Sequence, residues 1–134
     1  MLRVVVTVSA VACLNGCSCR PSDARAALVG QYRLSWRNGS NCSGRGIEDS
    51  TLELRRDGYS EQRDHFKDGS QFLTAGSWRY DGKDGVLLDN LRVTTTLEID
   101  KNASATPAGL IVKWSKPPNI LLNRDDDCLF VQTQ

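Results

Sequence analysis

The cysteines are the residues with the most chemical potential, because a thiol can hold a metal, form a disulfide or accept an acyl group. The chain has five of them: Cys13, Cys17, Cys19, Cys42 and Cys128. Zinc sites use Cys and His ligands at recognisable spacings. Here no CxxC pair occurs, and the single histidine, His65, lies far along the chain from the first three cysteines. We therefore expect no metal site, which leaves acylation and cross-linking.

An apolar run surrounds the first of these thiols. Val4–Leu14 contains no charged residue and directly follows the basic Arg3. A helix needs about 20 apolar residues to cross a membrane, so this run is too short to span one. A basic start, then about 7–15 apolar residues and then small residues, is typical of a secretory signal. The sequence thus predicts that the chain is exported.

The end of the apolar run reads Leu14-Asn15-Gly16-Cys17. This resembles the lipobox of bacterial lipoproteins, with an aliphatic residue at −3, a small residue at −1 and cysteine at +1. The resemblance implies that residues 1–16 are a signal peptide, that Cys17 carries the acyl chains (palmitate or a similar lipid), and that residues 17–27 form a tether. Ser18, rather than Asp, favours the outer membrane over the inner one. The alternative is a plain secretory signal cut between Ala12 and Cys19.

Two cysteines remain for the folded domain. Cys13 would leave with the signal and Cys17 would be acylated. Exported proteins meet an oxidising compartment in which disulfides persist. We therefore predict a Cys42–Cys128 bond, which encloses 86 positions and would contribute about 4–5 kcal/mol in the chain-entropy model. Cys19 is left over, either as a free thiol or for pairing between molecules.

Composition indicates one small domain in which neither sign of charge is in excess. The 134 residues carry 17 Lys+Arg and 16 Asp+Glu, so the loss of Arg3 with the signal makes the formal charge zero. No basic stripe stands out, and nucleic acid is therefore not an expected partner. We expect three parts: a signal peptide (1–16), a lipidated tether (17–27) and a β domain (28–134).

The body of the chain alternates short apolar–polar runs with turns. Asp57-Gly58 and Asp68-Gly69 each lie between such runs, which predicts hairpins with type I′ turns. Further strands are expected over 86–93, 92–100 and 110–114, with a loop over 101–109. Only Ser22–Leu28 looks helical, with Ser22 as the N-cap. The expected fold is all-β, a small antiparallel up-and-down barrel or a strongly curled meander of about eight to nine strands.

Cross-linking helps to choose between these shapes. Cys42 follows the first strand and Cys128 opens the last, and a meander brings those strands together only when its sheet closes. The stretch "LVGQYRL…LELRRDGYSEQ…AGSWRYDGKDGVLLDN" also resembles lipocalin-like bacterial domains, over about residues 28–90. That resemblance implies a closed barrel.

Aromatic residues of such a barrel either line a ligand cavity or fill the interior, and an eight-stranded barrel is wide enough for both. The candidates are Tyr32, Trp36, Trp78, Tyr80 and Trp114. We expect core filling, with cavity lining as the alternative.

Other polar residues give weaker signals. His65 has Asp64 as a neighbour, but adjacent strand residues point to opposite faces, and no nucleophile motif accompanies them. The run 125–127 (DDD) lacks the alternate spacing of a calcium loop and is expected to be a solvated turn. Three N-x-S sites, at Asn38, Asn41 and Asn102, would accept glycans only in a eukaryotic secreted protein.

These observations favour a non-catalytic binding role for a membrane-anchored protein of the bacterial cell envelope. Its expected partners are the lipid bilayer and either a small apolar ligand or an envelope protein, with no cofactor. One alternative is a plain secreted or periplasmic inhibitor or immunity-type protein that binds another protein; a second is a hydrolase of unknown type. An open apolar cavity would favour the small ligand. A filled interior with an exposed patch would favour a protein partner, and a buried polar cluster around His65 would favour an enzyme.

Overall fold

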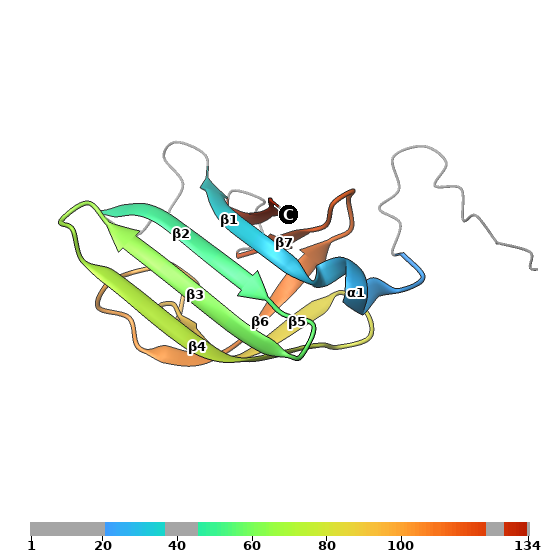
Figure 1. Ribbon diagram of the computed structural model, residues 1–134. Coiled ribbons are helices and arrows are strands. Elements are labelled where there is room, and N and C mark those ends of the chain that lie inside the picture. Colours follow the sequence, from blue (N-terminus) through green and yellow to red (C-terminus); the bar gives the residue numbers. More distant parts are fainter. Residues whose placement is uncertain (1–20, 37–45, 123–127, 134) are drawn as a thin grey trace, which may run out of the picture.

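The protein is an eight-stranded antiparallel barrel in the computed structural model, which describes residues 21–36, 46–122 and 128–133 (Figure 1). A five-residue helix precedes the strands: α1 Ala24–Leu28, β1 Gly30–Trp36, β2 Ile47–Leu54, β3 Tyr59–Phe66, β4 Gln71–Tyr80, β5 Gly85–Arg92, β6 Ala105–Lys113, β7 Asn119–Leu121 and β8 Cys128–Gln132. Each strand pairs with the next along the chain. Within the described residues, no helix has the length and apolar character of a membrane span.

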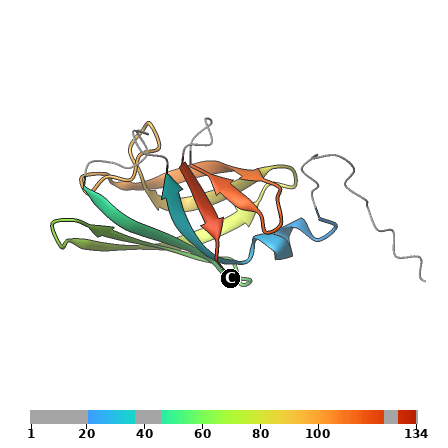
Figure 2. The ribbon, with the colours of Figure 1, turned by 90° about the horizontal axis from the view of Figure 1, so that it is seen from above.

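The sheet closes because its first and last strands pair. Tyr32 lies opposite Gln132, and Trp36 lies opposite Cys128, with β1 and β8 antiparallel. Figure 2 shows β1 and β8 side by side in the view from above. The expected up-and-down barrel is confirmed, and of its two expected forms the closed one is correct.

The two ends of the barrel differ. One end, here called the helix end, carries α1 and the connections 55–58, 81–84 and 114–118. The other, the loop end, carries the β3–β4 turn and the long connection 93–104. In Figure 1 the helix end lies at the right and the loop end at the left.

α1 closes the helix end by packing on the core. Leu28 is fully buried and Ala24 is nearly so. The N-cap is Asp23, whose side chain accepts a hydrogen bond from the backbone N–H of Ala26 at 3.1 Å; the expected N-cap, Ser22, is one residue too early. The carboxylate of Asp23, directly before the buried Ala24, satisfies a backbone donor that the helix itself leaves free.

The Asp-Gly hairpins occur where expected, but their turns are not type I′. Gly58 and Gly69 have φ values of 90° and 88°, whereas Asp57 and Asp68 do not have positive φ. A type I′ turn needs positive φ at both central residues. Instead, the Gly58 N–H donates to the Arg55 carbonyl, so the glycine follows the turn and takes the left-handed position alone.

The chain between β5 and β6 differs from expectation. Residues 94–98 form no strand although they are rich in β-branched side chains, and Ala105–Gly109 belong to β6 rather than to a loop. The β5–β6 register shifts between Leu88 and Leu91, and Pro107 has no partner in it. Proline has no N–H for a ladder and is therefore tolerated at such an irregularity.

Candidate functional site

Two of the aromatic candidates hold the helix end together. The Tyr32 O–H is buried and donates to the Leu28 carbonyl at 2.6 Å, and burial raises the pKa of this phenol. Trp78 donates through Nε1 to the Arg55 carbonyl at 2.7 Å, and the Arg25 guanidinium lies 4.7 Å from its ring centroid. The Tyr32 hydroxyl and the Trp78 indole N–H thus each donate to a specific backbone carbonyl.

Tyr80 and Trp114 contact each other, with ring centroids 5.9 Å apart and nearly perpendicular planes. Trp114 Nε1 donates to Asp84 Oδ1 at 3.0 Å, and the Tyr80 hydroxyl donates to the Lys83 carbonyl. Trp36 lies elsewhere, half-buried at the loop end of β1. The structure therefore brings one aromatic pair together and does not gather all five side chains around a single cavity.

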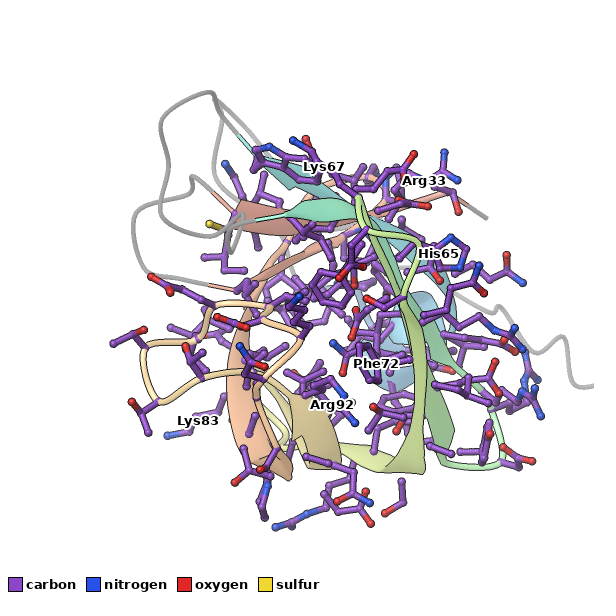
Figure 3. The ribbon with its side chains drawn as sticks, turned by 90° about the vertical axis from the view of Figure 1, so that its left-hand side faces the viewer. Arg33, His65, Lys67, Phe72, Lys83 and Arg92 are labelled. Atoms are coloured by element: carbon purple, nitrogen blue, oxygen red, sulfur yellow. The ribbon has the colours of Figure 1, made fainter. Side chains whose placement is uncertain are left out.

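His65 and Asp64 lie on opposite sides of the barrel wall. His65 is exposed, whereas Asp64 is fully buried in the interior. Figure 3, viewed from the loop end, shows His65 outside the strands and Phe72 and Arg92 inside them. The alternation of strand side chains accounts for this separation.

Asp64 is the centre of a polar cluster that the sequence did not single out. Its Oδ1 accepts hydrogen bonds from Ser50 Oγ at 2.7 Å and from Gln62 Nε2 at 3.1 Å. All three side chains are buried. Burial raises the pKa of the Asp64 carboxyl to about 6, against the smaller opposing effects of these two bonds and of Arg92.

Gln62 connects this carboxyl to β5 across the barrel. Its Oε1 accepts from the Arg92 backbone N–H at 2.7 Å, and its Nε2 also lies 3.2 Å from the Arg92 carbonyl. The Arg92 guanidinium lies 4.5 Å from the Phe72 ring centroid and donates to the Ala103 carbonyl at 2.7 Å. The hairpin at Asp57-Gly58 is the sequence signal from which this cluster could have been found. It places Gln62 opposite the inward-facing Leu52, and Asp64 follows two residues later on the same face.

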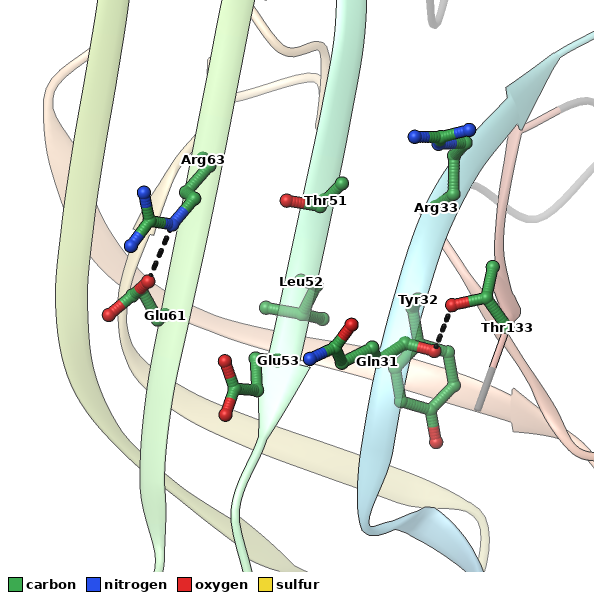
Figure 4. Close-up of a pocket in the computed structure, with 9 residues that line it drawn as sticks. All are labelled: Gln31, Tyr32, Arg33, Thr51, Leu52, Glu53, Glu61, Arg63 and Thr133. Atoms are coloured by element: carbon green, nitrogen blue, oxygen red, sulfur yellow. Dashed lines mark hydrogen bonds and ion pairs between the residues drawn. The ribbon is translucent and has the colours of Figure 1, made fainter.

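The outer wall carries a groove of about 290 Å³ over β1, β2 and β3 (Figure 4). Two cross-strand rows border it, and the strand register sets both. The first row runs Arg33, Thr51, Arg63, Leu73, and the second runs Gln31, Glu53, Glu61, Ala75. A basic row and an acidic row thus lie side by side on one face.

Local contacts fix the charges of this face, which we call the charged face. Glu61 accepts from Arg63 Nε at 2.7 Å and from the Tyr59 hydroxyl at 2.9 Å. The Tyr59 hydrogen bond, followed by Arg63, lowers the pKa of Glu61. Leu73, which lies opposite Arg63, is 57% exposed, the largest exposure among the described large apolar side chains.

Several sequence predictions fall outside the described residues. These are Cys17, Cys19, Cys42, the 125–127 run and the N-x-S sites at Asn38 and Asn41. Cys128 is fully buried at the start of β8. Because Cys42 is not described, the Cys42–Cys128 bond stays a prediction. Asn102 is exposed and lies in a turn. Among the described residues, no three His, Cys, Asp or Glu side chains are grouped so that they could hold a metal ion.

Comparison with known proteins adds no relative: neither the protein-family models, nor the curated proteins, nor the solved structures gave a match.

Proposed function

We propose that this chain is a lipid-anchored, non-catalytic binding protein of the bacterial cell envelope that recognises a protein partner through its charged face. The anchor is the acylated Cys17, in a lipobox-like Leu14–Cys17 segment. The observation that carries the choice of partner is Leu73, an exposed apolar side chain that lies at the β4 end of the basic row, opposite Arg63.

Leu73 has the surroundings of an interface anchor. Binding energy concentrates in a few apolar, aromatic or Arg side chains that enter pockets of a partner, while the charges around them set orientation and specificity. Arg63 and Glu61 are each held by a neighbour, so the face is ordered before it meets a partner. A partner with an apolar pocket at the end of an acidic and a basic strip complements this arrangement.

A small apolar ligand fits the barrel interior less well. In the part of the chain that the structure describes, twenty-one buried hydrophobic residues pack into the core, and the aromatic candidates at the helix end are tied by hydrogen bonds. The remaining interior around Asp64 and Arg92 is polar, and an apolar ligand there would bury these groups without giving them partners. The outer wall is therefore the better-supported surface.

A photo-crosslinking amino acid at position 73 tests the protein-partner proposal in the native envelope. Leu73 is expected to give one discrete adduct, whereas the same label at Ile111, a 47% exposed position on β6, gives none. The captured protein is then purified and its affinity is measured directly. Leu73→Asp and Arg63→Glu should each weaken binding at least tenfold; equal labelling from both positions, or unchanged affinity, would reject the charged face as the docking surface.

The anchor is tested separately. Cys17→Ala should abolish incorporation of labelled palmitate and move the protein from the membrane pellet to the soluble fraction, since stable attachment needs acyl chains. Cys19→Ala, a thiol two residues away, is the matched control and should leave both readouts unchanged. Continued membrane association of the Cys17→Ala protein would contradict the lipoprotein assignment without bearing on the partner surface.

A further inference from the structure

The ladder between β4 and β5 covers only part of β4. The two strands pair over three residues, and residues 71–77 of β4, here called the seam, have no partner in that register. Two side chains of β5 replace the ladder at one end of the seam. Asp89 Oδ1 accepts from the Ser77 backbone N–H at 2.6 Å, and Asn90 Nδ2 donates to the Ala75 carbonyl at 3.2 Å. Among the described residues, no other side chain of β5 bonds to the backbone of the seam.

Alternation along β4 decides which of its backbone groups face the seam. In an antiparallel ladder, every second residue bonds to the same neighbouring strand. At one end of the β3–β4 ladder the Phe66 N–H donates to the Ser70 carbonyl, and at the other end the Trp78 N–H donates to the glycine carbonyl of the β2–β3 turn, both at 2.9 Å. The even-numbered residues of β4 therefore bond to β3. The N–H and C=O groups of Gln71 and Leu73 point the other way, toward β5.

The chain after β5 gives these groups no partner. If the β4–β5 register continued, Val93 would lie opposite Leu73, but its N–H donates to the Leu91 carbonyl at 3.1 Å. The chain thus turns at this point instead of extending the ladder. In the described part of the protein, the backbone N–H and C=O groups of Gln71 and Leu73 have no hydrogen-bond partner.

This edge of β4 is exposed and carries no charge. Gln71, Leu73 and Ala75 are all exposed, Leu73 by 57%. Edge strands of natural proteins usually carry a charged residue, a proline or a bulge that prevents pairing with another chain. Here only the far end of the seam has such protection, from Asp89. A groove of about 410 Å³ on the outer wall adjoins that end, at Ser77 and Asp89.

We propose that an extended segment of the protein partner pairs with Gln71 and Leu73 as an added strand of the barrel wall. This inference rests on the proposed function and deepens it, because the added strand lies directly beside Leu73. Backbone hydrogen bonds hold such a segment, and its alternate side chains set specificity. Since the outward side chains of the seam are uncharged, those of the segment are uncharged as well.

The boundaries of the seam favour a single segment over a second copy of this chain. Asp89 and Asn90 close one end. At the other end, Lys101 Nζ lies 3.0 Å from Asp68 Oδ2 and joins the connection 93–104 to the β3–β4 turn. A seam bounded at both ends admits one strand, whereas a second barrel would bring its whole wall with its edge.

A synthetic peptide of alternating threonine and valine, with a lysine at each end, is the probe. The same peptide with N-methyl groups on its central residues cannot donate to β4 and is the control. ¹⁵N NMR of the full-length protein should show saturable shifts of the Gln71 and Leu73 amides at millimolar peptide, and the control should bind weaker by about tenfold or more, since it loses two hydrogen bonds. No shift at Leu73, or equal binding of the two peptides, overturns the proposal.

Amide exchange in the free protein tests the alternation itself. The amides of Phe72 and Thr74, which bond to β3, should exchange more slowly than that of Leu73, by about tenfold or more. A Leu73 amide that is already protected would mean that another part of the chain or a second copy fills the seam, and it overturns the proposal.

Proline at position 73 separates backbone recognition from side-chain recognition. Leu73→Pro removes the free N–H and leaves the β3–β4 ladder intact, and proline is tolerated on such an edge. It should weaken peptide binding by about tenfold or more, whereas Leu73→Ala, which keeps the N–H, should weaken it by less than about threefold. Gln71→Pro, at the first residue of β4, is the second variant if Leu73→Pro does not fold. Equal effects of the proline and alanine variants overturn the proposal.

The peptide experiments need no captured partner, so their result is independent of photo-crosslinking at position 73. With a captured partner, the Leu73 amide should become protected in the complex. A partner that binds while this amide still exchanges freely would reject the added strand and leave the charged face as the docking surface.

Discussion

The carboxyl group of Asp64 is the centre of the hydrogen-bonded polar cluster inside the barrel. It is fully buried, it organises Ser50 and Gln62, and the charge of Arg92 acts on it without a direct ion pair. In the sequence, His65 was the candidate catalytic residue, and Asp64 stood only as its neighbour. Adjacent strand residues face opposite ways, so the exposed histidine and the buried carboxyl could not both belong to one site.

Asp64 should make stability depend on pH between about 4 and 7. Its pKa is raised to about 6 in the folded protein, above the usual 3.8. The folded state therefore binds the proton more tightly, and its contribution to stability is full below about pH 3.8 and is lost as pH rises through about 6. A shift of this size corresponds to a loss on the order of 3 kcal/mol.

Urea unfolding of the wild type and of Asp64→Asn at pH 4.5 and 7.5 measures this loss. The wild type should lose stability toward neutral pH relative to the variant, which has no titrating carboxyl at that position. Asp49→Asn, a substitution of a half-exposed carboxyl on β2, serves as control. The exposed carboxyls of Asp68, Asp81 and Asp89 have lowered pKa values, so their contributions change at more acidic pH. Parallel pH profiles for wild type and Asp64→Asn would contradict the raised pKa.

At the scale of elements, turn chemistry carried most of the predictive information. The Asp-Gly pairs at residues 57–58 and 68–69 and the 81–85 turn each join consecutive antiparallel strands, and these connections define the meander. The missed region was 92–109, where the β-branched run 94–96 resembles a strand. The shift in the β5–β6 register and the buried Ile99 draw this segment over the loop end instead. Such a tertiary override cannot be seen in local propensity.

The helix is the element whose contribution is simplest to measure. Leu28 is fully buried where α1 closes the barrel, so Leu28→Ala should lower the free energy of unfolding by about 3 kcal/mol. Leu73→Ala makes the same chemical change at a 57% exposed position and should stay within about 0.5 kcal/mol. The two variants are compared by urea denaturation; similar effects would mean that α1 does not pack on the core in solution.

For the molecule as a whole, alternation and turns predicted the barrel, and the expected cross-link predicted its closure. That cross-link stays a prediction: Cys128 is described and lies opposite Trp36, whereas Cys42 lies outside the described residues. The polar cluster and the two charged rows were not predicted. Both depend on which residues face each other across several strands, and a single sequence gives no such register beyond a hairpin.

The Cys42–Cys128 bond predicts a redox-dependent stability. Reduction should lower the free energy of unfolding by up to about 4 kcal/mol, since it releases a long loop in the unfolded chain. Urea denaturation with and without dithiothreitol measures the difference in the wild type. The Cys42→Ser/Cys128→Ser double variant should already be destabilised and should not respond to the reductant. A wild type that also ignores the reductant would argue against the bond.

The β1–β8 pairing constrains the order of assembly. Hairpins such as β2–β3 form between neighbours in the chain, but β1 receives its second partner only from a strand that begins 92 positions after its last residue, Trp36. Long loop closures are slow steps in folding. A chain that is synthesised N-terminus first therefore carries an open strand edge until its last residues arrive, and its exposure to aggregation is set by the rate of synthesis rather than by the stability of the finished barrel.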